Sequence, residues 1–213
     1  MIGTLIVIAK APRAGHSKTR LCPPCTPQQA ADLAAAALGD TLDAVTATSA
    51  DRRLLVLDGP AGAWLPSGFD VVPQVAGGLG DRLAGAFTHV DGPAFLVGMD
   101  TPQVAAGDLE AGLRALGTHD AVLGCAPDGG YWGIGLRQPV PGAFDGVPMS
   151  EDDTGAAQLA RLHSLGLTVA ALPQLRDVDT IDDAVAVAEQ APQTRFAAAL
   201  AAIAPDRVSE RAA

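Results

Sequence analysis

A basic loop follows the first apolar segment of the chain. The segment AKAPRAGHSKTRL, residues 9–21, comes directly after TLIVI. It holds four of the 14 lysines and arginines in the protein, namely Lys10, Arg13, Lys18 and Arg20. An arginine can bind two phosphate oxygens with its planar guanidinium, and a lysine adds a compact charge, so this mixture suits a di- or triphosphate. We therefore predict a polyphosphate site here; the alternative is a solvated charged loop.

Gly15 gives this loop the conformational freedom to turn back on itself. Lys18 and Arg20 would then point into the same volume as Lys10, which stands at the exit of the first predicted strand. The Walker motif GxxxxGK[ST] does not occur in the chain. A P-loop phosphate site is therefore excluded.

Three aspartates have the chemistry of a magnesium site. Asp100 follows the most apolar predicted strand, and a single valine separates Asp177 from Asp179. An extended backbone would turn the last two carboxylates to one side. Converging carboxylates repel one another unless a cation stands between them, and Mg²⁺ prefers oxygen ligands shared with substrate phosphates. We predict a Mg²⁺ or Mn²⁺ site; the alternative for Asp179 is that it or Thr180 caps the following helix.

Two short segments could complete a binding site. Residues 77–80, GGLG, lead into a predicted helix, so their backbone N–H groups could contact a base or a phosphate. The dinucleotide fingerprint GxGxxG does not occur there. Residues 128–132, DGGYW, place two of the few aromatic side chains beside a carboxylate, as the wall of a substrate site would. A tight hairpin turn is the alternative for this second segment.

Strands and helices alternate along the chain. The sequence TPQQ predicts a capped helix that begins at Pro27 and runs to about Thr48. Further helices are predicted over 78–90, 108–116 and 154–166 and from Ile181. Strands are predicted for the first apolar segment and for 53–58, 70–74, 94–98, 120–126, 131–137 and 167–173. The strand over 131–137 is expected to pair antiparallel with a neighbour.

This alternation predicts one α/β domain over residues 1–204. Several strands are apolar on both faces, which indicates a three-layer α/β/α arrangement around a mostly parallel, Rossmann-like mixed sheet. Ligands of such sheets bind outside the carboxyl ends of the strands. The basic loop and the three aspartates all follow strands, so we expect them at the same edge. Residues 205–213 have no apolar period and are predicted to be disordered.

Composition narrows the class of protein. The chain has 213 residues, 48% of them hydrophobic, and a net charge of −10. This balance is typical of a globular protein and argues against binding to nucleic acid or to a membrane. The first apolar segment is too short to cross a bilayer and no basic region precedes it, so we expect a cytoplasmic protein.

The three cysteines suggest no disulfide framework. Cys22 and Cys25 form a CPPC sequence, which could be a redox or metal pair. We interpret it instead as a proline-stiffened loop that enters the helix after Thr26. Cys125 lies in an apolar predicted strand and is expected in the core.

Five segments of the chain resemble the nucleotide-diphospho-sugar transferases, whose fold is called GT-A. They are KAPRAGHSKTRLCPP, GGLGDRLAGAF, FLVGMDTP, APDGGYWGIGL and DVDTIDD, spread over residues 10–183. A more specific resemblance is to the bacterial family labelled a selenodomain-associated or arsenosugar-associated glycosyltransferase. The first segment, MDTP and DVDT are also similar to the 2-phospholactate guanylyltransferases and, more distantly, to the molybdenum-cofactor nucleotidyltransferases.

The resemblance implies a GT-A-like enzyme that uses a divalent metal and a nucleotide. The implied metal ligands are Asp100, Asp177 and Asp179. The residues expected to bind nucleotide are Ala9, Lys10, Gly15, Lys18, Arg20, Gly78, Leu79, Gly80, Asp81 and Arg82. Those expected to bind the substrate are Thr101, Asp128, Gly129, Gly130 and Tyr131. Those expected to act in catalysis are Lys10, Lys18, Arg20 and Asp100.

We expect a transferase that moves a nucleotidyl group from an NTP to a small anionic metabolite, a phosphate or a carboxylate, with release of pyrophosphate. Such a reaction needs charge stabilisation more than an acid or a base. This agrees with the lack of any evident Ser-His-Asp or Cys-His pattern in the sequence. The alternatives are sugar transfer from an NDP-sugar and nucleotide binding without catalysis. The oligomeric state is left open, with a homodimer as one option.

Overall fold

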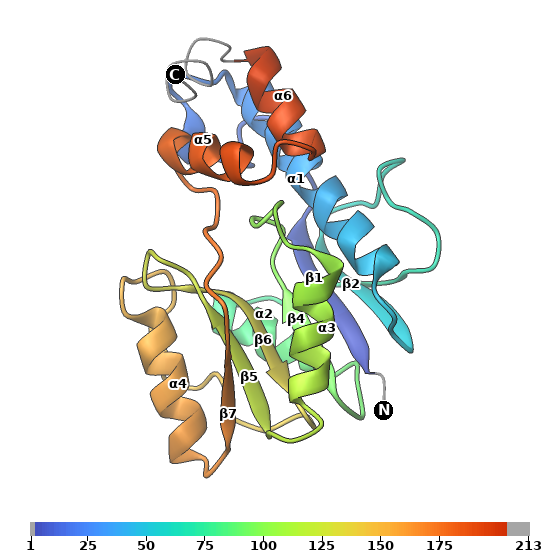
Figure 1. Ribbon diagram of the computed structural model, residues 1–213, viewed down its shortest axis with the longest axis vertical. Helices are drawn as coiled ribbons and strands as arrows, with labels where there is room; N and C mark the ends of the chain where they lie inside the picture. The colour runs from blue at the N-terminus through green and yellow to red at the C-terminus, as the bar shows by residue number, and fades with distance from the viewer. Residues whose placement is uncertain (1–2, 204–213) are drawn as a thin grey trace.

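The computed structural model describes residues 3–203. These residues form one seven-stranded sheet flanked by helices (Figure 1). The strands are β1 (Thr4–Lys10), β2 (Arg52–Asp58), β3 (Asp70–Pro73), β4 (Ala94–Val97), β5 (Ala121–Cys125), β6 (Tyr131–Leu136) and β7 (Val169–Leu172). The tail that was predicted to be disordered, 205–213, lies outside the described residues.

The sheet is mixed and mostly parallel, as predicted. Its order is β3-β2-β1-β4-β6-β5-β7. β6 runs antiparallel to both of its neighbours, β4 and β5, and the other pairs are parallel. β6 is antiparallel to both β4 and β5, so β5 runs in the same direction as β4 and β1. The β5–β6 hairpin turn therefore lies at the edge of the sheet where the parallel strands end.

Helices cover both faces of the sheet, which confirms the α/β/α class. They are α1 (Pro27–Ala47), α2 (Leu79–Phe87), α3 (Ala106–Ala115), α4 (Thr154–Ser164), α5 (Ile181–Gln190) and α6 (Arg195–Ile203), with a 3-10 turn η1 (Thr19–Leu21). Successive residues of β1 point to opposite faces. Leu5 and Val7 pack in the core with α1 and α3, and Ile6 packs in a second core with α2 and α4.

Short-range caps explain where two helices begin. The Thr26 hydroxyl accepts from Gln29 N at 3.2 Å, and Gln29 Oε1 accepts from Thr26 N at 2.8 Å, which is the predicted capping box of α1. Thr180 and Asp183 form the same reciprocal arrangement at the start of α5. Thr180 is therefore the N-cap of α5, and Asp179 does not cap this helix.

The C-terminal part of the chain forms a third cluster away from the sheet, at the upper end in Figure 1. The sequence predicts one helix from Ile181, but the structure has two, because Pro192 lies in the break between α5 and α6. Asp40 of α1 accepts hydrogen bonds at 2.9 Å from the backbone nitrogens of Arg195 and Phe196. These bonds tie the start of α6 to α1.

The cysteines lie where the sequence places them. Cys22 and Cys25 are free thiols in the connection between η1 and α1, and Cys25 packs in the third cluster. Burial raises the pKa of the Cys25 thiol, so burial opposes thiolate formation. Cys125 ends β5 and is partly buried. Among residues 3–203, no helix combines the length and the apolar character needed to cross a membrane.

Candidate functional site

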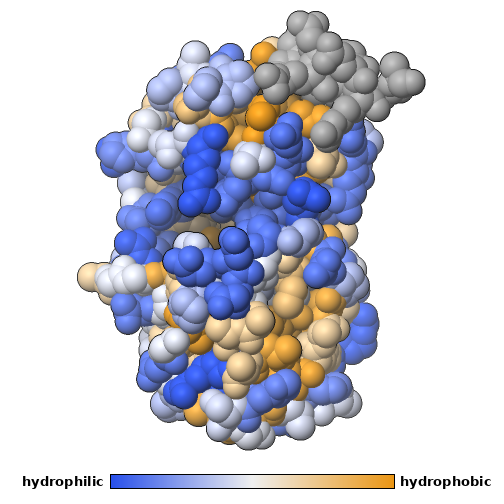
Figure 2. All heavy atoms as spheres, turned by 90° about the vertical axis from the view of Figure 1, so that its left-hand side faces the viewer, coloured by the Kyte–Doolittle hydropathy of each residue, from blue (hydrophilic) through white to orange (hydrophobic). Residues whose placement is uncertain are grey.

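A cavity of about 970 Å³ opens at the carboxyl ends of the parallel strands. Its lining comes from the segments after β1, β4 and β7, from the start of α2 and from the β5–β6 turn, together with 149–154. Figure 2 shows the face that carries α4 and α5, on which hydrophilic side chains gather across the middle of the molecule. The cavity is at the edge where the sequence predicts ligand binding.

The Lys18 side chain of the basic loop is nearly buried and lies between acidic groups. Its ammonium group lies 2.8 Å from Asp100 Oδ1 and 3.6 Å from Asp179 Oδ1, and it donates a hydrogen bond to the carbonyl of Val178. Only 9% of the side chain is exposed. The residue has a φ of 49°, a left-handed conformation that turns the loop toward the aspartates. The predicted contact between the basic loop and the acidic segments is therefore present.

Arg20 and Lys10 hold different positions in this loop. Arg20 Nη1 lies 2.8 Å from Asp179 Oδ2, and 71% of the arginine side chain is exposed. Lys10 ends β1, lines the cavity and is exposed. Its backbone nitrogen donates to Met99 Sδ at 3.3 Å. Both side chains are accessible to a ligand in the cavity.

The middle of the basic loop, residues 11–15, lies outside the cavity lining, whereas His16, Ser17 and Thr19 belong to the lining. Gly15 has the positive φ expected at a turn, 76°, and does not line the cavity. Arg13 is exposed, and its guanidinium lies 3.4 Å from His16 Nε2. The Arg13 backbone nitrogen donates to the buried Ser17 hydroxyl at 3.0 Å, which closes the turn.

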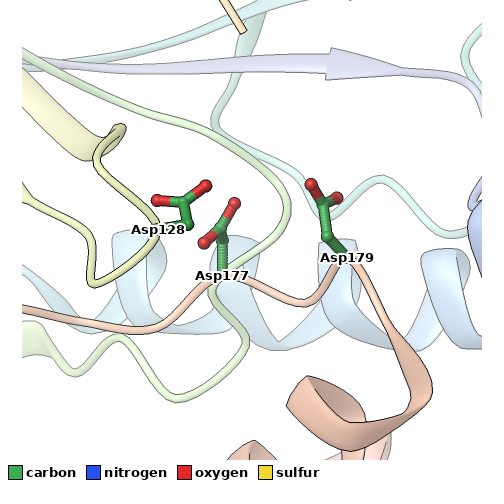
Figure 3. A group of neighbouring side chains, drawn as sticks. All are labelled: Asp128, Asp177 and Asp179. Carbon is green, nitrogen blue, oxygen red and sulfur yellow. The ribbon is translucent and has the colours of Figure 1, made fainter. Parts of the chain in front are cut away.

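Three carboxylates converge on one side of the cavity, those of Asp128, Asp177 and Asp179. One oxygen from each lies within 4.8 Å of the others. Figure 3 shows Asp177 and Asp179 projecting from one stretch of chain and Asp128 from a neighbouring turn. Val178 between them is fully buried in the third cluster, which agrees with the predicted extended DVD segment.

The structure thus brings two of the three predicted metal ligands, Asp177 and Asp179, together with Asp128, and Asp100 is not a member of this close group. Asp128, which the sequence assigns to substrate binding, lies beside Asp177 and Asp179. Asp100 lies nearby, and its carboxylate forms an ion pair with Lys18. The backbone links these loops, because Val178 N donates to Asp100 O at 2.9 Å.

The group has the electrostatics of a cation site. Burial raises the pKa of Asp177 to about 6, and the charges of Asp128 and Asp179 contribute to this rise, while Lys18 acts in the opposite direction. A divalent cation would relieve this repulsion. Carboxylate oxygens are ligands that hard divalent cations prefer.

The start of α2 is tied to the first two strands by a polar network. Gln74 donates from Nε2 to Ala9 O at 2.7 Å, and its Oε1 accepts from Arg82 Nη1 at 3.1 Å. Arg82 Nη1 also lies 2.9 Å from Asp58 Oδ2. Gln74 is not among the site residues predicted from the sequence, where its only signal is its position at the end of a predicted strand.

Some polar groups at the predicted glycine segment are used in hydrogen bonds within the protein, whereas other residues of the segment line the cavity. Gly78 N donates to Asp81 Oδ2 at 2.8 Å, so this N–H and this carboxylate are used at the start of α2. Leu79 lines the cavity with 45% of its surface exposed. Gly80 lies against Met149 and Phe144, outside the main cavity but on a smaller adjoining pocket.

One wall of the cavity is built from two loops in close backbone contact, the β5–β6 turn and the loop before α4. A β-carbon on Gly129 would stand 1.7 Å from the carbonyl oxygen of Asp152, and the Gly129 φ of 92° also favours glycine. Gly155 N donates to Gly129 O at 2.7 Å. Within the turn, Asp128 Oδ1 accepts from Gly130 N at 2.9 Å. The predicted hairpin turn is therefore present, and it lines the cavity.

Aromatic and hydroxyl side chains also line the cavity. Burial raises the pKa of Tyr131, whose hydroxyl lies 3.4 Å from Gln158 Oε1. Trp132 is buried and donates from Nε1 to Pro173 O at 3.0 Å, so its ring supports the sheet. Thr101 lines the cavity and is 2% exposed. Its Oγ1 has no hydrogen-bond partner among the described residues.

Several solved structures share this fold. A protein from Desulfovibrio desulfuricans G20, provisionally named a nucleotide-diphospho-sugar transferase, is 26% identical with a TM-score of 0.86 over 99% of this chain and 98% of its own. The manganese complex of Rv0371c from Mycobacterium tuberculosis H37Rv is 23% identical, with a TM-score of 0.52 over 89% of this chain and 100% of its own. A CMP:2-keto-3-deoxy-manno-octonic acid synthetase in complex with CTP is 12% identical, with a TM-score of 0.58 over 90% and 99%.

These likenesses confirm that the fold is that of the nucleotide-diphospho-sugar transferase-like superfamily. No curated protein sequence matches the chain significantly. A family model matches residues 33–151, more than half of the chain. The protein therefore belongs to the family described as an uncharacterized protein conserved in bacteria, DUF2064.

Proposed function

We propose that this protein is a divalent-metal-dependent transferase that moves a nucleotidyl group from an NTP to a small metabolite and releases pyrophosphate. One observation carries the proposal: a group of three carboxylates lies beside Lys18 and Arg20 in a single cavity at the carboxyl edge of the sheet. The cavity volume of about 970 Å³ is at the upper end of the range of small-molecule sites, which suits a nucleotide with an acceptor.

The acidic and the basic residues of the cavity would bind different parts of a metal–nucleotide complex. Asp128, Asp177 and Asp179 would hold Mg²⁺ or Mn²⁺, which when bound neutralises charge on the nucleotide phosphates. Lys10, Lys18 and Arg20 would bind the phosphate oxygens and stabilise the negative charge that builds up as pyrophosphate leaves. Asp100 holds the Lys18 ammonium in place. We assign Asp100 a positioning role toward Lys18.

Solved structures with the same fold support the proposal that this protein binds a nucleotide and a divalent metal. The synthetase mentioned above was solved with CTP, and the mycobacterial protein was solved with manganese. A 2-C-methyl-D-erythritol 4-phosphate cytidylyltransferase from Thermus thermophilus shares the fold at 18% identity, with a TM-score of 0.53. We infer the same ligand classes for this chain because its cavity presents cations and carboxylates together.

Sugar transfer from an NDP-sugar is the second candidate. The Desulfovibrio protein that shares 26% of its residues carries that provisional name. In that reaction the wall around Asp128 and Tyr131 would face the sugar, and the leaving group would be a nucleoside diphosphate.

A donor screen separates the candidates. Thermal unfolding is measured with each of the four NTPs and with a panel of NDP-sugars, with and without Mg²⁺ or Mn²⁺. A ligand at about 100 times its Kd adds about 2.7 kcal/mol to the free energy of unfolding. We expect a metal-dependent shift with one or more NTPs and pyrophosphate release in a coupled assay. Nucleoside diphosphate release from an NDP-sugar would favour sugar transfer, and tight binding without turnover across a broad acceptor panel would indicate a nucleotide-binding protein.

A further inference from the structure

The Arg82 guanidinium is held by three hydrogen bonds at the start of α2. Its Nε donates to Gly77 O at 3.2 Å, and its Nη1 donates to Asp58 Oδ2 at 2.9 Å and to Gln74 Oε1 at 3.1 Å. These bonds use the hydrogen of Nε and both hydrogens of Nη1, and the two hydrogens of Nη2 remain. Arg82 therefore keeps one nitrogen, in a fixed orientation, for a ligand.

The Nη2 atom of Arg82 is accessible. Among residues 3–203, the buried side-chain nitrogen and oxygen atoms without a hydrogen-bond partner are Thr101 Oγ1 and Gln103 Oε1. Arg82 Nη2 has no partner within that range either and is not one of these atoms, so it is not buried. The residue lines the main cavity, and 26% of its side chain is exposed. Nη2 can therefore donate hydrogen bonds to a ligand in the cavity.

Leu79 supplies an independent observation on the same helix. It precedes Arg82 by three residues and Leu83 by four, so the three side chains share one face of α2, and all three line the cavity. Leu83 is buried, whereas Leu79 is 45% exposed. The other exposed large apolar side chains of the described residues, Val71 and Val75, lie outside the lining. An exposed leucine beside a directed N–H donor fits a flat apolar ring with polar edges, such as a nucleobase.

Arg82 lies far from the group of three carboxylates. Its partner Asp58 ends β2, whereas Asp128 follows β5. Four strand spacings separate β2 from β5 in the sheet order, which corresponds to roughly 19 Å. Lys10 ends β1, the strand next to β2. A nucleotide whose phosphates bind the metal and the basic loop would therefore extend toward Arg82 with its base.

We infer that Arg82 selects the nucleobase and favours a base with a carbonyl oxygen at purine position 6 or pyrimidine position 4. This inference rests on the nucleotide binding of the proposed function. Arg82 Nη2 can only donate, so it matches a carbonyl oxygen and opposes the amino group that adenine and cytosine carry at these positions. Gln74 cannot form the amide pairing typical of adenine, because its Nε2 donates to Ala9 O at 2.7 Å and to Val56 O at 3.2 Å.

Pairs of nucleotides that differ at this group test the inference. ITP is compared with ATP, GTP with 2,6-diaminopurine riboside triphosphate, and UTP with CTP. Each is titrated calorimetrically into the protein with Mn²⁺ and without an acceptor, so binding is measured independently of transfer. We expect the carbonyl member of at least one pair to bind at least about tenfold more tightly than the amino member.

The outcomes separate this inference from the proposed reaction. A tenfold preference without pyrophosphate release from any NTP would support the role of Arg82, and the proposed nucleotidyl transfer would fail by itself. Equal affinities within every pair, or tighter binding of the amino members, would overturn the inference, while pyrophosphate release would still support the transfer. No binding of any nucleotide would contradict both.

Two arginines provide matched variants. Arg82 and Arg176 both line the cavity, and each forms an ion pair with an aspartate, at 2.9 and 2.8 Å. Arg82→Lys keeps the positive charge and removes Nη2, so the ratio of affinities within the preferred pair should fall at least about fivefold. Arg176→Lys should leave this ratio within about twofold of the wild type. An unchanged ratio in Arg82→Lys, or an equal fall in both variants, would contradict the assignment.

Two exposed apolar residues test the position of the base and leave the Arg82 hydrogen bonds in place. Leu79→Ala removes apolar contact with the ring, so both members of a pair should bind at least about threefold more weakly at an unchanged ratio. Val71 is 43% exposed and lies outside the lining, and Val71→Ala should change neither affinity. Both side chains are on the surface, so these variants decide the matter even where Arg82→Lys fails to fold. Equal effects of the two substitutions would mean that no base lies on Leu79 and would overturn the inference.

Discussion

The Lys18 ammonium lies 2.8 Å from Asp100 Oδ1 and joins the loop after β1 to the loop after β4. The contact places a nearly buried cation beside the carboxylates of the DVD segment, whose Val178 carbonyl accepts a hydrogen bond from the same ammonium. Lys18 thus offsets part of the repulsion among the aspartates and at the same time lies within reach of a ligand in the cavity.

Removal of Lys18 should weaken nucleotide binding. Lys18→Ala loses a charged hydrogen bond to phosphate, so we expect a loss of about 1.5 to 3 kcal/mol in binding free energy, measured by calorimetry with the preferred NTP. Arg13→Ala removes the same charge from the same loop outside the cavity lining, and it should change binding by less than about 0.5 kcal/mol. Comparable losses in both variants would indicate that the loop acts only through its net charge.

Asparagine variants should distinguish the metal ligands from Asp100. Asp128→Asn removes an oxygen from the group of three carboxylates, and we expect Mn²⁺ affinity to fall by at least about tenfold. Asp100→Asn should leave Mn²⁺ affinity within about threefold of the wild type and should reduce turnover, because Lys18 loses its partner. Direct titration with Mn²⁺ and a turnover assay measure the two effects. The opposite ranking would support the ligand set predicted from the sequence.

Metal binding should depend on pH near 6. The pKa of Asp177 is raised from 3.8 to about 6, mainly by burial, and a metal ion requires the ionised carboxylate. Affinity for Mn²⁺ should therefore rise as the pH rises through about 6 and level off above it. Asp177→Asn should lose this dependence along with most of its affinity. A flat affinity profile of the wild type between pH 5 and 8 would argue against Asp177 as a ligand.

The same group should destabilise the metal-free protein at neutral pH. Because folding raises the pKa of Asp177, the folded state disfavours the ionised form, and the free energy of unfolding falls as the pH rises from about 4 to about 6. Metal-free Asp177→Asn should therefore be more stable than the wild type at pH 7, and this difference should shrink below pH 4. Urea denaturation at several pH values measures the effect. Equal stability of the two proteins at pH 7 would contradict it.

A methyl group at Gly129 should push apart the β5–β6 turn and the loop before α4. Gly129→Ala combines a left-handed backbone with a contact of 1.7 Å to the Asp152 carbonyl, so we expect a loss of at least about 3 kcal/mol in the free energy of unfolding. Gly146→Ala is a matched control: its φ is 73° and its β-carbon would have no neighbour within 4 Å. It should lose about 1 to 2 kcal/mol. Similar losses in urea denaturation would mean that the two loops separate easily.

Much of the fold could be predicted because it depends on residues that are close in sequence. The apolar run of β1 is buried on both faces, and the TPQQ sequence forms the capping box of α1 as predicted. The antiparallel direction of β6 also agreed with the prediction. A helix begins at Ile181 as predicted, but the further helix α6 after Pro192, which has Asp40 of α1 as its partner, was not predicted. That partner lies far away in the sequence, so no local pattern reveals it.

The sequence by itself determined which residue types stand at the carboxyl ends of the strands: cations after β1, and carboxylates after β4, β5 and β7. The rule for parallel sheets then brought them to one edge. Only the tertiary structure decided that Asp128, and not Asp100, lies in one group with Asp177 and Asp179. That grouping depends on the insertion of β6 between β4 and β5 and on the nearly buried position of Lys18 beside Asp100. Distances of a few ångströms between residues on different strands are set by strand order and loop packing, which no spacing along the chain encodes.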